Sequence, residues 1–224
     1  QSFTRNLRFN NVIGSRQRTK RGKWTDATVT LADGRVLLTP PEGDELHCLG
    51  LLTGEPMWQA KPRDESLYLA CVHEGHVVMV GKRSVIAYDL KDGKQIWSLP
   101  VSSQRETTGI AAVPSGRGFL SGDQYFLPTT RELIQIDIQA GKIAEAVRTE
   151  QRLGNLLSYR DHIVSFGPDF LTAFYRGDRL KLLVENRLEK DPEDPWSIEQ
   201  RGLLALDDGQ RDEALRYLRQ AYEL

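Results

Sequence analysis

Apolar and polar residues alternate over short stretches along most of the first 175 positions. In the best-defined part of the chain, four such stretches follow one another, at residues 67–74, 75–81, 84–90 and 94–100. An alternation with a period of two is typical of β-strands that place one face against a core. We therefore expect this part of the chain to form four short strands.

Turn-forming residues separate these predicted strands. Glu74-Gly75 and Gly81-Lys82 follow the first two strands, and Asp92-Gly93 follows the third. An Asp-Gly pair is favoured in a two-residue type I′ hairpin, because both central residues of that turn need a positive φ. The pattern predicts a tight hairpin at Asp92-Gly93.

The four-strand unit is repeated along the chain. A preceding unit has turns at Asp33-Gly34 and Thr53-Gly54, and its predicted strands are residues 25–31, 34–39, 45–51 and 55–60. A third unit covers about residues 109–150, and a shortened fourth unit has its strands at residues 154–160, 162–167 and 170–175. The chain thus contains about four copies of one pattern.

The copies share a glycine and a tryptophan at a fixed spacing. Gly54 and Gly93 are 39 residues apart, and so are Trp58 and Trp97, each four positions after its glycine. Four strands repeated about every 40 residues are typical of the blades of a β-propeller. A single blade cannot bury both of its faces, so neighbouring blades stack. We therefore predict that both tryptophans lie between adjacent blades and that each indole N–H donates to a backbone carbonyl.

The spacing Ala-x-Asp-x-x-x-Gly-x-x-x-Trp resembles the tryptophan-docking repeat of PQQ-type propellers. That family includes quinoprotein dehydrogenases and many non-catalytic proteins, among them an outer-membrane assembly lipoprotein. The matching positions are Ala87, Asp89, Gly93 and Trp97 in the second unit, Thr53, Gly54 and Trp58 in the first, and Asp137 and Gly141 in the third. Gly50 replaces the aspartate of the first copy, and Glu145 replaces the tryptophan of the third.

The resemblance implies a mainly β fold, a partial propeller over residues 1–175 made of about four antiparallel blades. A closed propeller of this type normally needs more blades than this part of the chain can form. We expect further blades upstream of Gln1, or an open arc.

After Tyr175 the apolar period changes. Leu180, Leu183, Val184 and Leu188 form a stripe with helical spacing, with Asp178 as the expected N-cap and Pro192 as the end of the helix. The following residues resemble a tetratricopeptide repeat of 34 residues, with small or apolar residues where two antiparallel helices approach: Gly202, Gly209, Ala214, Leu218 and Ala221. We therefore predict a second, α-helical segment of tetratricopeptide type over residues 176–224.

Charge narrows the range of partners. The chain has 30 basic and 31 acidic residues and no apolar run long enough to span a membrane. One basic run, Arg16–Lys23, precedes Trp24 and offers an alternative function as a polyanion-binding module. We interpret this run as a solvated loop and expect no nucleic-acid partner.

The cysteines and histidines offer little further chemistry. Cys48 and Cys71 can form a disulfide in an oxidising compartment. We favour the interpretation that both cysteines are small apolar residues within strands. His47, His73 and His76 lie near these cysteines in the sequence. Because adjacent strand residues face opposite sides, His47 and Cys48 cannot share one site. We therefore expect no metal site.

The resulting functional hypothesis is a non-enzymatic scaffold without a cofactor. Its propeller and helices would bind protein or peptide partners in an extracytoplasmic compartment. The enzymatic alternative implied by the resemblance is a PQQ- and Ca²⁺-dependent quinoprotein dehydrogenase domain. No adjacent cysteine pair of the kind often found beside the quinone occurs in the chain.

Overall fold

The computed structural model describes residues 27–102, 112–149, 151–160, 162–175 and 177–224. Within these ranges the chain forms fifteen strands and then three helices. The strands are grouped in four sheets, and in each sheet every strand pairs antiparallel with the next one along the chain. The prediction of a mainly β fold built from antiparallel four-stranded sheets is confirmed.

The first three sheets have four strands each. Sheet 1 contains β1 (Thr30–Ala32), β2 (Arg35–Leu38), β3 (Glu45–Gly50) and β4 (Lys61–Pro62). Sheet 2 contains β5 (Ser66–His73), β6 (His76–Gly81), β7 (Ser84–Asp89) and β8 (Gln95–Pro100). Sheet 3 contains β9 (Phe119–Ser121), β10 (Gln124–Pro128), β11 (Glu132–Asp137) and β12 (Lys142–Arg148).

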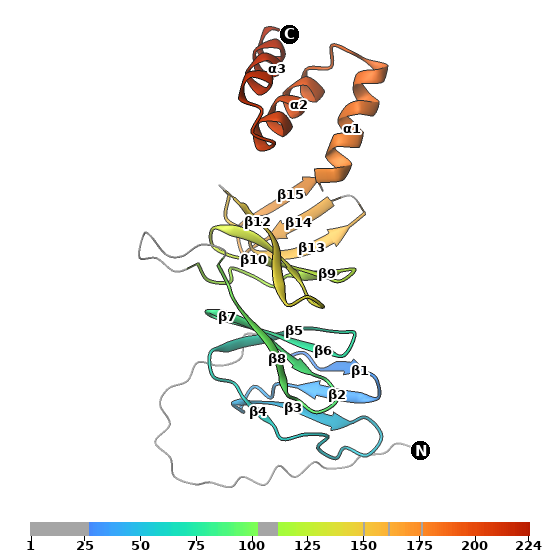
Figure 1. The fold of residues 1–224 in the computed structure, drawn as a ribbon, viewed down its shortest axis with the longest axis vertical. Helices are drawn as coiled ribbons and strands as arrows, with labels where there is room; N and C mark the ends of the chain where they lie inside the picture. Colours follow the sequence, from blue (N-terminus) through green and yellow to red (C-terminus); the bar gives the residue numbers. More distant parts are fainter. Residues whose placement is uncertain (1–26, 103–111, 150, 161, 176) are drawn as a thin grey trace.

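The last sheet is shorter and leads into the helices. Sheet 4 contains β13 (Asn155–Tyr159), β14 (His162–Phe166) and β15 (Leu171–Tyr175). The helices are α1 (Gly177–Lys190), α2 (Pro195–Asp207) and α3 (Arg211–Glu223). The four sheets follow one another in chain order along the long axis of the molecule, and the helices lie beyond sheet 4 (Figure 1). Sheets 1 and 4 are at opposite ends, so the described chain forms an open stack rather than a closed ring.

Two hairpins have the backbone geometry of type I′ turns. Asp33 and Gly34 have φ values of 45° and 71°, and Glu74 and Gly75 have 43° and 79°. The prediction for Asp92-Gly93 was wrong, because β7 and β8 are separated by five residues and only Gly93 of this pair has a positive φ, of 70°. The Gly93 N–H donates to the Asp89 carbonyl at 2.8 Å, which closes a wider loop.

The fourth strand of the first unit is also displaced from its predicted position. Residues 55–60 form no strand beyond an isolated bridge at Pro56, and β4 lies just after them, where it pairs with Glu45 and Leu46. Pro56 lacks an N–H for the ladder, which disfavours a regular strand there. The first predicted strand, residues 25–31, begins outside the described residues, and β1 starts at Thr30.

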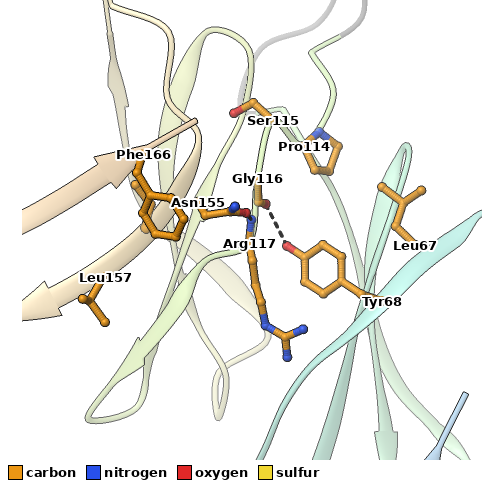
Figure 2. Close-up of a pocket in the computed structure, with 10 residues that line it drawn as sticks. Leu67, Tyr68, Pro114, Ser115, Gly116, Arg117, Asn155, Leu157 and Phe166 are labelled. Atoms are coloured by element: carbon orange, nitrogen blue, oxygen red, sulfur yellow. Dashed lines mark hydrogen bonds between the residues drawn. The ribbon is translucent and has the colours of Figure 1, made fainter. Parts of the chain in front are cut away.

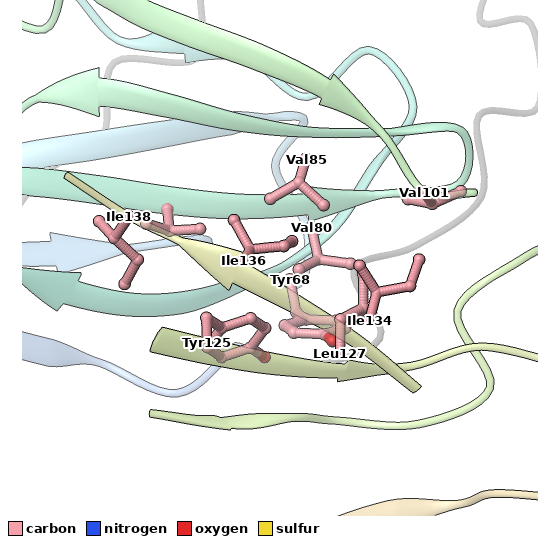
Figure 3. Packing of buried hydrophobic residues seen from close by; sticks show 10 residues of the cluster. Tyr68, Val80, Val85, Val101, Tyr125, Leu127, Ile134, Ile136 and Ile138 are labelled. Carbon is pink, nitrogen blue, oxygen red and sulfur yellow. The ribbon is translucent and has the colours of Figure 1, made fainter. Parts of the chain in front are cut away.

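The sheets in the interior of the stack bury both faces. A core between sheets 2 and 3 includes Val78, Val80, Tyr125, Ile134 and Ile136 (Figure 3). A second core lies between sheets 1 and 2, where Val77 and Met79 pack with residues of the first sheet. Because β6 is buried on both sides, its sequence is a continuous apolar run rather than an alternation.

The helical segment follows the predicted periodicity, with one change at its start. Val184 is buried in α1, and the helix ends at Lys190, two residues before Pro192. Asp178 is the second residue of α1 and therefore not its N-cap, since the helix begins almost directly after β15. For α2, the Asp194 carboxylate accepts from the Ser197 N–H at 3.1 Å, which satisfies a free donor of the first turn.

Candidate binding site

The indole of Trp58, in the loop between β3 and β4, contacts the loop that follows β7 in sheet 2. Its Nε1–H donates to the Leu90 carbonyl at 3.1 Å, and the side chain is 8% exposed. The ring lies against Gly93, where an added Cβ would be 2.8 Å from ring carbon Cδ2. Gly93 therefore has two reasons to lack a side chain: its positive φ and the indole beside it.

Trp97 makes the corresponding contact one sheet further along. Its Nε1–H donates to the Ile138 carbonyl at 2.9 Å, and a Cβ on Gly141 would be 2.6 Å from ring carbon Cδ1. On its own sheet Trp97 lies opposite Ala87, which is fully buried. The structure thus brings together residues of the repeat that are far apart in sequence.

The aspartates of the repeat shape the loops that receive the indoles. The Asp89 carboxylate accepts from the Lys91 N–H at 2.6 Å, and the Asp137 carboxylate accepts from the Ala140 N–H at 2.8 Å. In the first loop Gly50 replaces the aspartate, and a Cβ there would be 2.6 Å from the Thr53 hydroxyl. The Thr53 hydroxyl instead accepts from the Glu55 N–H at 3.2 Å.

A cleft with a volume of about 630 Å³ lies where three sheets converge (Figure 2). Its walls come from the first strand of sheet 2, from residues 114–117 before β9, and from the first two strands of sheet 4. The lining residues are Leu67, Tyr68, Pro114, Ser115, Gly116, Arg117, Asn155, Leu156, Leu157 and Phe166. Most of the lining is apolar, and a few polar groups are interspersed, as is common in ligand-binding sites.

Hydrogen bonds across the sheets fix the polar side of the cleft. The Tyr68 hydroxyl donates to the Gly116 carbonyl at 3.1 Å (Figure 2). Arg117 donates from Nη2 to the Leu69 carbonyl at 3.0 Å, and its guanidinium carbon lies 5.4 Å from the centre of the Tyr68 ring. The Arg117 N–H donates to the Asn155 side chain at 2.8 Å. The wall is therefore held in place from three sheets.

One residue of the wall carries a polar atom that the described residues leave without a partner. The Ser115 hydroxyl oxygen is buried and has no hydrogen-bond partner among the described residues. A buried hydroxyl without a partner costs free energy, and such groups call for a ligand or water. Ser115 lines the cleft, and its hydroxyl has no partner within the described part of the chain.

Burial changes the acidity of two groups near the cleft. Desolvation raises the pKa of the Tyr68 hydroxyl to about 12 and the pKa of the Cys71 thiol to about 12. Both groups are therefore protonated and uncharged at neutral pH.

Cys48 and Cys71 are free thiols, so the disulfide alternative was wrong.

Two hairpin tips on neighbouring sheets share a small cluster of polar groups. His73 Nε2 and Asp123 Oδ1 are 2.7 Å apart, and a carboxylate oxygen of Glu74 completes a set of three atoms within 4.8 Å of one another. A histidine and two carboxylates suit Zn²⁺ by ligand type. The cluster is largely exposed, and the imidazole–carboxylate pair itself already links sheets 2 and 3. His47, by contrast, lies near Glu45 on sheet 1.

The α2–α3 pair is close-packed at the positions that the sequence singled out. A Cβ on Gly202 would be 2.9 Å from Leu218 Cγ, and Ala214 is 1% exposed. Gly209 has a φ of 79° in the turn between the helices, and Ala221 is half-buried. The tetratricopeptide character of this segment stays a prediction.

The residues of the cleft were missed by the sequence analysis. Tyr68, Ser115, Arg117 and Asn155 belong to three units, and none of them lies in the repeat motif. The one local signal is Gly116-Arg117-Gly118, a polar residue between two glycines that lack room for a Cβ. The basic run Arg16–Lys23 lies outside the described residues, so the polyanion-binding hypothesis stays a prediction.

Stacked antiparallel sheets, of which the first three have four strands and are linked through a repeated indole–glycine contact, define a PQQ-type β-propeller repeat protein. The model of the family described as "Outer membrane protein assembly factor BamB" matches residues 11–164. The chain belongs to this family.

Solved structures with a TM-score of 0.50 or more show the same type of fold. The extracellular domain of the hybrid two component system BT4673 from B. thetaiotaomicron matches 66% of this chain and 20% of its own, with 17% identity and a TM-score of 0.51. The computationally designed Ika4 protein matches 69% of this chain and 93% of its own, with 16% identity and a TM-score of 0.50. BamB from Moraxella catarrhalis matches 66% of this chain, with 14% identity and a TM-score of 0.49.

The chain spans 47% of the length of that BamB and one fifth of the BT4673 domain. Among curated protein sequences there is no significant match. None of the helices in the described part of the chain has the length and apolar character needed to cross a bilayer.

Proposed function

We propose that this protein is a non-catalytic scaffold that binds an extended segment of a partner protein in the cleft between sheets 2, 3 and 4. The observation that carries the proposal is a mostly apolar cleft whose lining includes Ser115, a residue whose buried hydroxyl has no partner among the described residues. A peptide would place an apolar side chain between Leu67 and Leu157 and offer its backbone N–H or carbonyl to Ser115. The ordered side chains of Tyr68 and Arg117 keep the wall rigid, which reduces the entropy cost of binding.

The donor set of the cleft does not fit quinoprotein chemistry. A quinoprotein site needs carboxylate oxygens for Ca²⁺ and a carboxylate base, and none of the described lining residues is Asp or Glu. Turnover in a dye-linked alcohol or sugar oxidation assay, after reconstitution with PQQ and Ca²⁺, would overturn the non-catalytic assignment.

The binding proposal is tested by selecting peptides against the folded chain. A displayed random peptide library is panned on the wild-type protein alone, and the affinities of the selected peptides are then measured on Ser115→Trp, which fills the cleft. Selected peptides should lose at least about tenfold in affinity on Ser115→Trp, roughly 1.4 kcal/mol. The matched control is Thr53→Trp in an exposed loop of sheet 1, which should leave affinity unchanged. Peptides that bind all three proteins equally would place the binding surface elsewhere.

We also propose that α2 and α3 form one tetratricopeptide repeat and extend the partner-binding surface. Support comes from the Gly202–Leu218 contact and from the exposed Leu203 and Leu206 on α2.

The family assignment supports an extracytoplasmic location for this protein. Fractionation of cells that express the tagged native protein tests this location, and recovery in the cytoplasmic fraction alone would contradict it.

A further inference from the structure

Two hairpin tips meet where sheets 2 and 3 face each other, at the far end of β5 from the cleft. His73 is the last residue of β5, Glu74 follows it in the turn to β6, and Asp123 lies in the turn between β9 and β10. The cleft is lined by Tyr68 near the start of β5. A strand advances about 3.3 Å per residue, so Tyr68 and His73 are roughly 16 Å apart along β5. The tips are therefore separate from the cleft.

The three side chains of these tips converge. His73 Nε2 is 2.7 Å from Asp123 Oδ1, and these two atoms and a carboxylate oxygen of Glu74 all lie within 4.8 Å of one another. Two ligands of one Zn²⁺ ion are at most about 4.4 Å apart, because each bond to the metal is roughly 2.0–2.2 Å long. A small rotation of the exposed Glu74 side chain therefore completes a set of three zinc ligands.

The negative charge at the tips is not balanced by basic side chains. Within the described part of the chain, neither Glu74 nor Asp123 forms an ion pair with a lysine or an arginine. Two carboxylates at this separation repel each other, and a divalent cation bound between them removes the repulsion. The imidazole of His73 then favours zinc, since Ca²⁺ and Mg²⁺ take oxygen ligands.

Backbone hydrogen bonds hold both tips in place. The Gly75 carbonyl accepts from the Leu90 N–H at 2.7 Å, and the Asp123 carbonyl accepts from the Ile138 N–H at 3.0 Å. Leu90 and Ile138 are also the residues whose carbonyls accept the two docked indoles. Each tip is thus tied to a loop that a contact between sheets already fixes. A site on such loops loses little conformational entropy when it binds.

We propose that His73, Glu74 and Asp123 bind one Zn²⁺ ion, which links the hairpin tips of sheets 2 and 3. His73 coordinates through Nε2 as a neutral imidazole, and water fills the remaining position, as in zinc sites with three protein ligands. The ion adds a second connection between two sheets that Trp97 already joins. The pattern of cysteines and histidines did not show this site, because Asp123 belongs to the next unit of the repeat. The inference does not depend on peptide binding in the cleft.

The first test is calorimetric titration of the 224-residue protein with Zn²⁺. The protein is prepared without a histidine tag and treated with a chelator. It should show saturable binding of one ion per chain with a Kd below about 0.1 mM. With Zn²⁺ at about a hundred times this Kd, the midpoint of thermal unfolding should rise by about 5–10 °C. Weaker or non-saturable binding would overturn the proposal.

Replacing each ligand with an uncharged amide tests the three assignments. Glu74→Gln, Asp123→Asn and His73→Gln should each weaken Zn²⁺ binding at least about tenfold, because losing even an outer partner of a zinc ligand costs that much. Glu74→Gln is the decisive variant, since it leaves the pair of His73 and Asp123 intact and so preserves the link between the sheets. Circular dichroism establishes that the other two variants are folded. Wild-type affinity in the folded Glu74→Gln variant would show that the site is wrong.

His47→Gln is the matched control. His47 Nε2 also lies near one carboxylate, 3.8 Å from Glu45 Oε2, and its side chain is 23% exposed, against 20% for His73. The described residues place no third ligand beside this pair, so the control should keep the wild-type affinity. A loss equal to that of His73→Gln would mean that Zn²⁺ binds any accessible imidazole, which contradicts the proposal. Displacement of Zn²⁺ by an excess of Ca²⁺ would contradict it as well, because it would indicate a site made of oxygen ligands alone.

Discussion

The indole of Trp97 lies against Gly141 on the next sheet, so close that a methyl group on Gly141 would be 2.6 Å from ring carbon Cδ1. The same relationship joins Trp58 to Gly93. In both cases the indole also donates to a carbonyl three residues before the glycine. The repeat motif thus encodes a contact between units rather than within one.

Replacing Trp58 with Ala should lower the free energy of unfolding by about 3–5 kcal/mol, because a buried indole is lost and a cavity is left. The Leu90 carbonyl also loses its donor. Urea denaturation measures the change. Tyr222→Ala serves as the control, since that side chain is 93% exposed, and it should change stability by less than about 0.5 kcal/mol. Equal effects of the two substitutions would contradict a packing role for Trp58.

Gly141→Ala should be more destabilising than Gly122→Ala. Both glycines have positive φ, 60° and 56°, so both variants incur a backbone cost of roughly 1–2 kcal/mol. Only Gly141 has an indole within reach of the new Cβ, whereas nothing lies within 4 Å at Gly122. Overpacking should add about 1–3 kcal/mol at Gly141. Thermal and urea unfolding of both variants give the difference, and equal losses would show that the ring moves freely.

Stability should fall as the pH rises from about 9 towards about 12, in part because of Cys71. Burial raises the pKa of this thiol to about 12, from an ordinary value of 9.0. Over this window the unfolded chain has lost the proton and the folded chain has kept it, so the contribution is complete below about pH 9 and is lost progressively as the pH rises towards about 12. Cys71→Ala should flatten the slope of unfolding free energy against pH. An unchanged slope would show that the thiol is accessible to water.

The Asp194 carboxylate should stabilise the start of α2 only while it is ionised. Hydrogen bonds from Ser197 and then Arg187 hold the pKa of this carboxyl below its ordinary value of 3.8. Its contribution is therefore present above about pH 3.8 and is lost as the pH falls through the lower folded pKa. Asp194→Asn keeps a side-chain oxygen for the cap but loses the ion pair with Arg187, so it should remove the pH dependence and lower the helix stability near neutral pH less than Asp194→Ala, which also loses the cap. Helical circular dichroism against pH distinguishes the two variants.

The repeat was readable from the sequence because each unit has to make the same contact. Gly54, Gly93 and Gly141 occupy positions with positive φ, and the period of two changes to a helical period after Tyr175. Strand bounds were less predictable where proline or loop hydrogen bonds compete with the ladder, as at residues 55–60 and in the loop around Asp92. These outcomes depend on which backbone donors find partners, and pattern alone does not show this.

The sequence by itself determined the type of the repeated unit, the approximate number of units and the change from strands to helices. These features depend on local periodicity and on residues with special backbone freedom, such as glycine. Only the tertiary structure decided which units touch. It placed Tyr68, Ser115, Arg117 and Asn155, from three separate units, around one cleft. The physical reason is that burial and contact depend on how whole sheets stack in space, and no single stretch of sequence carries that information.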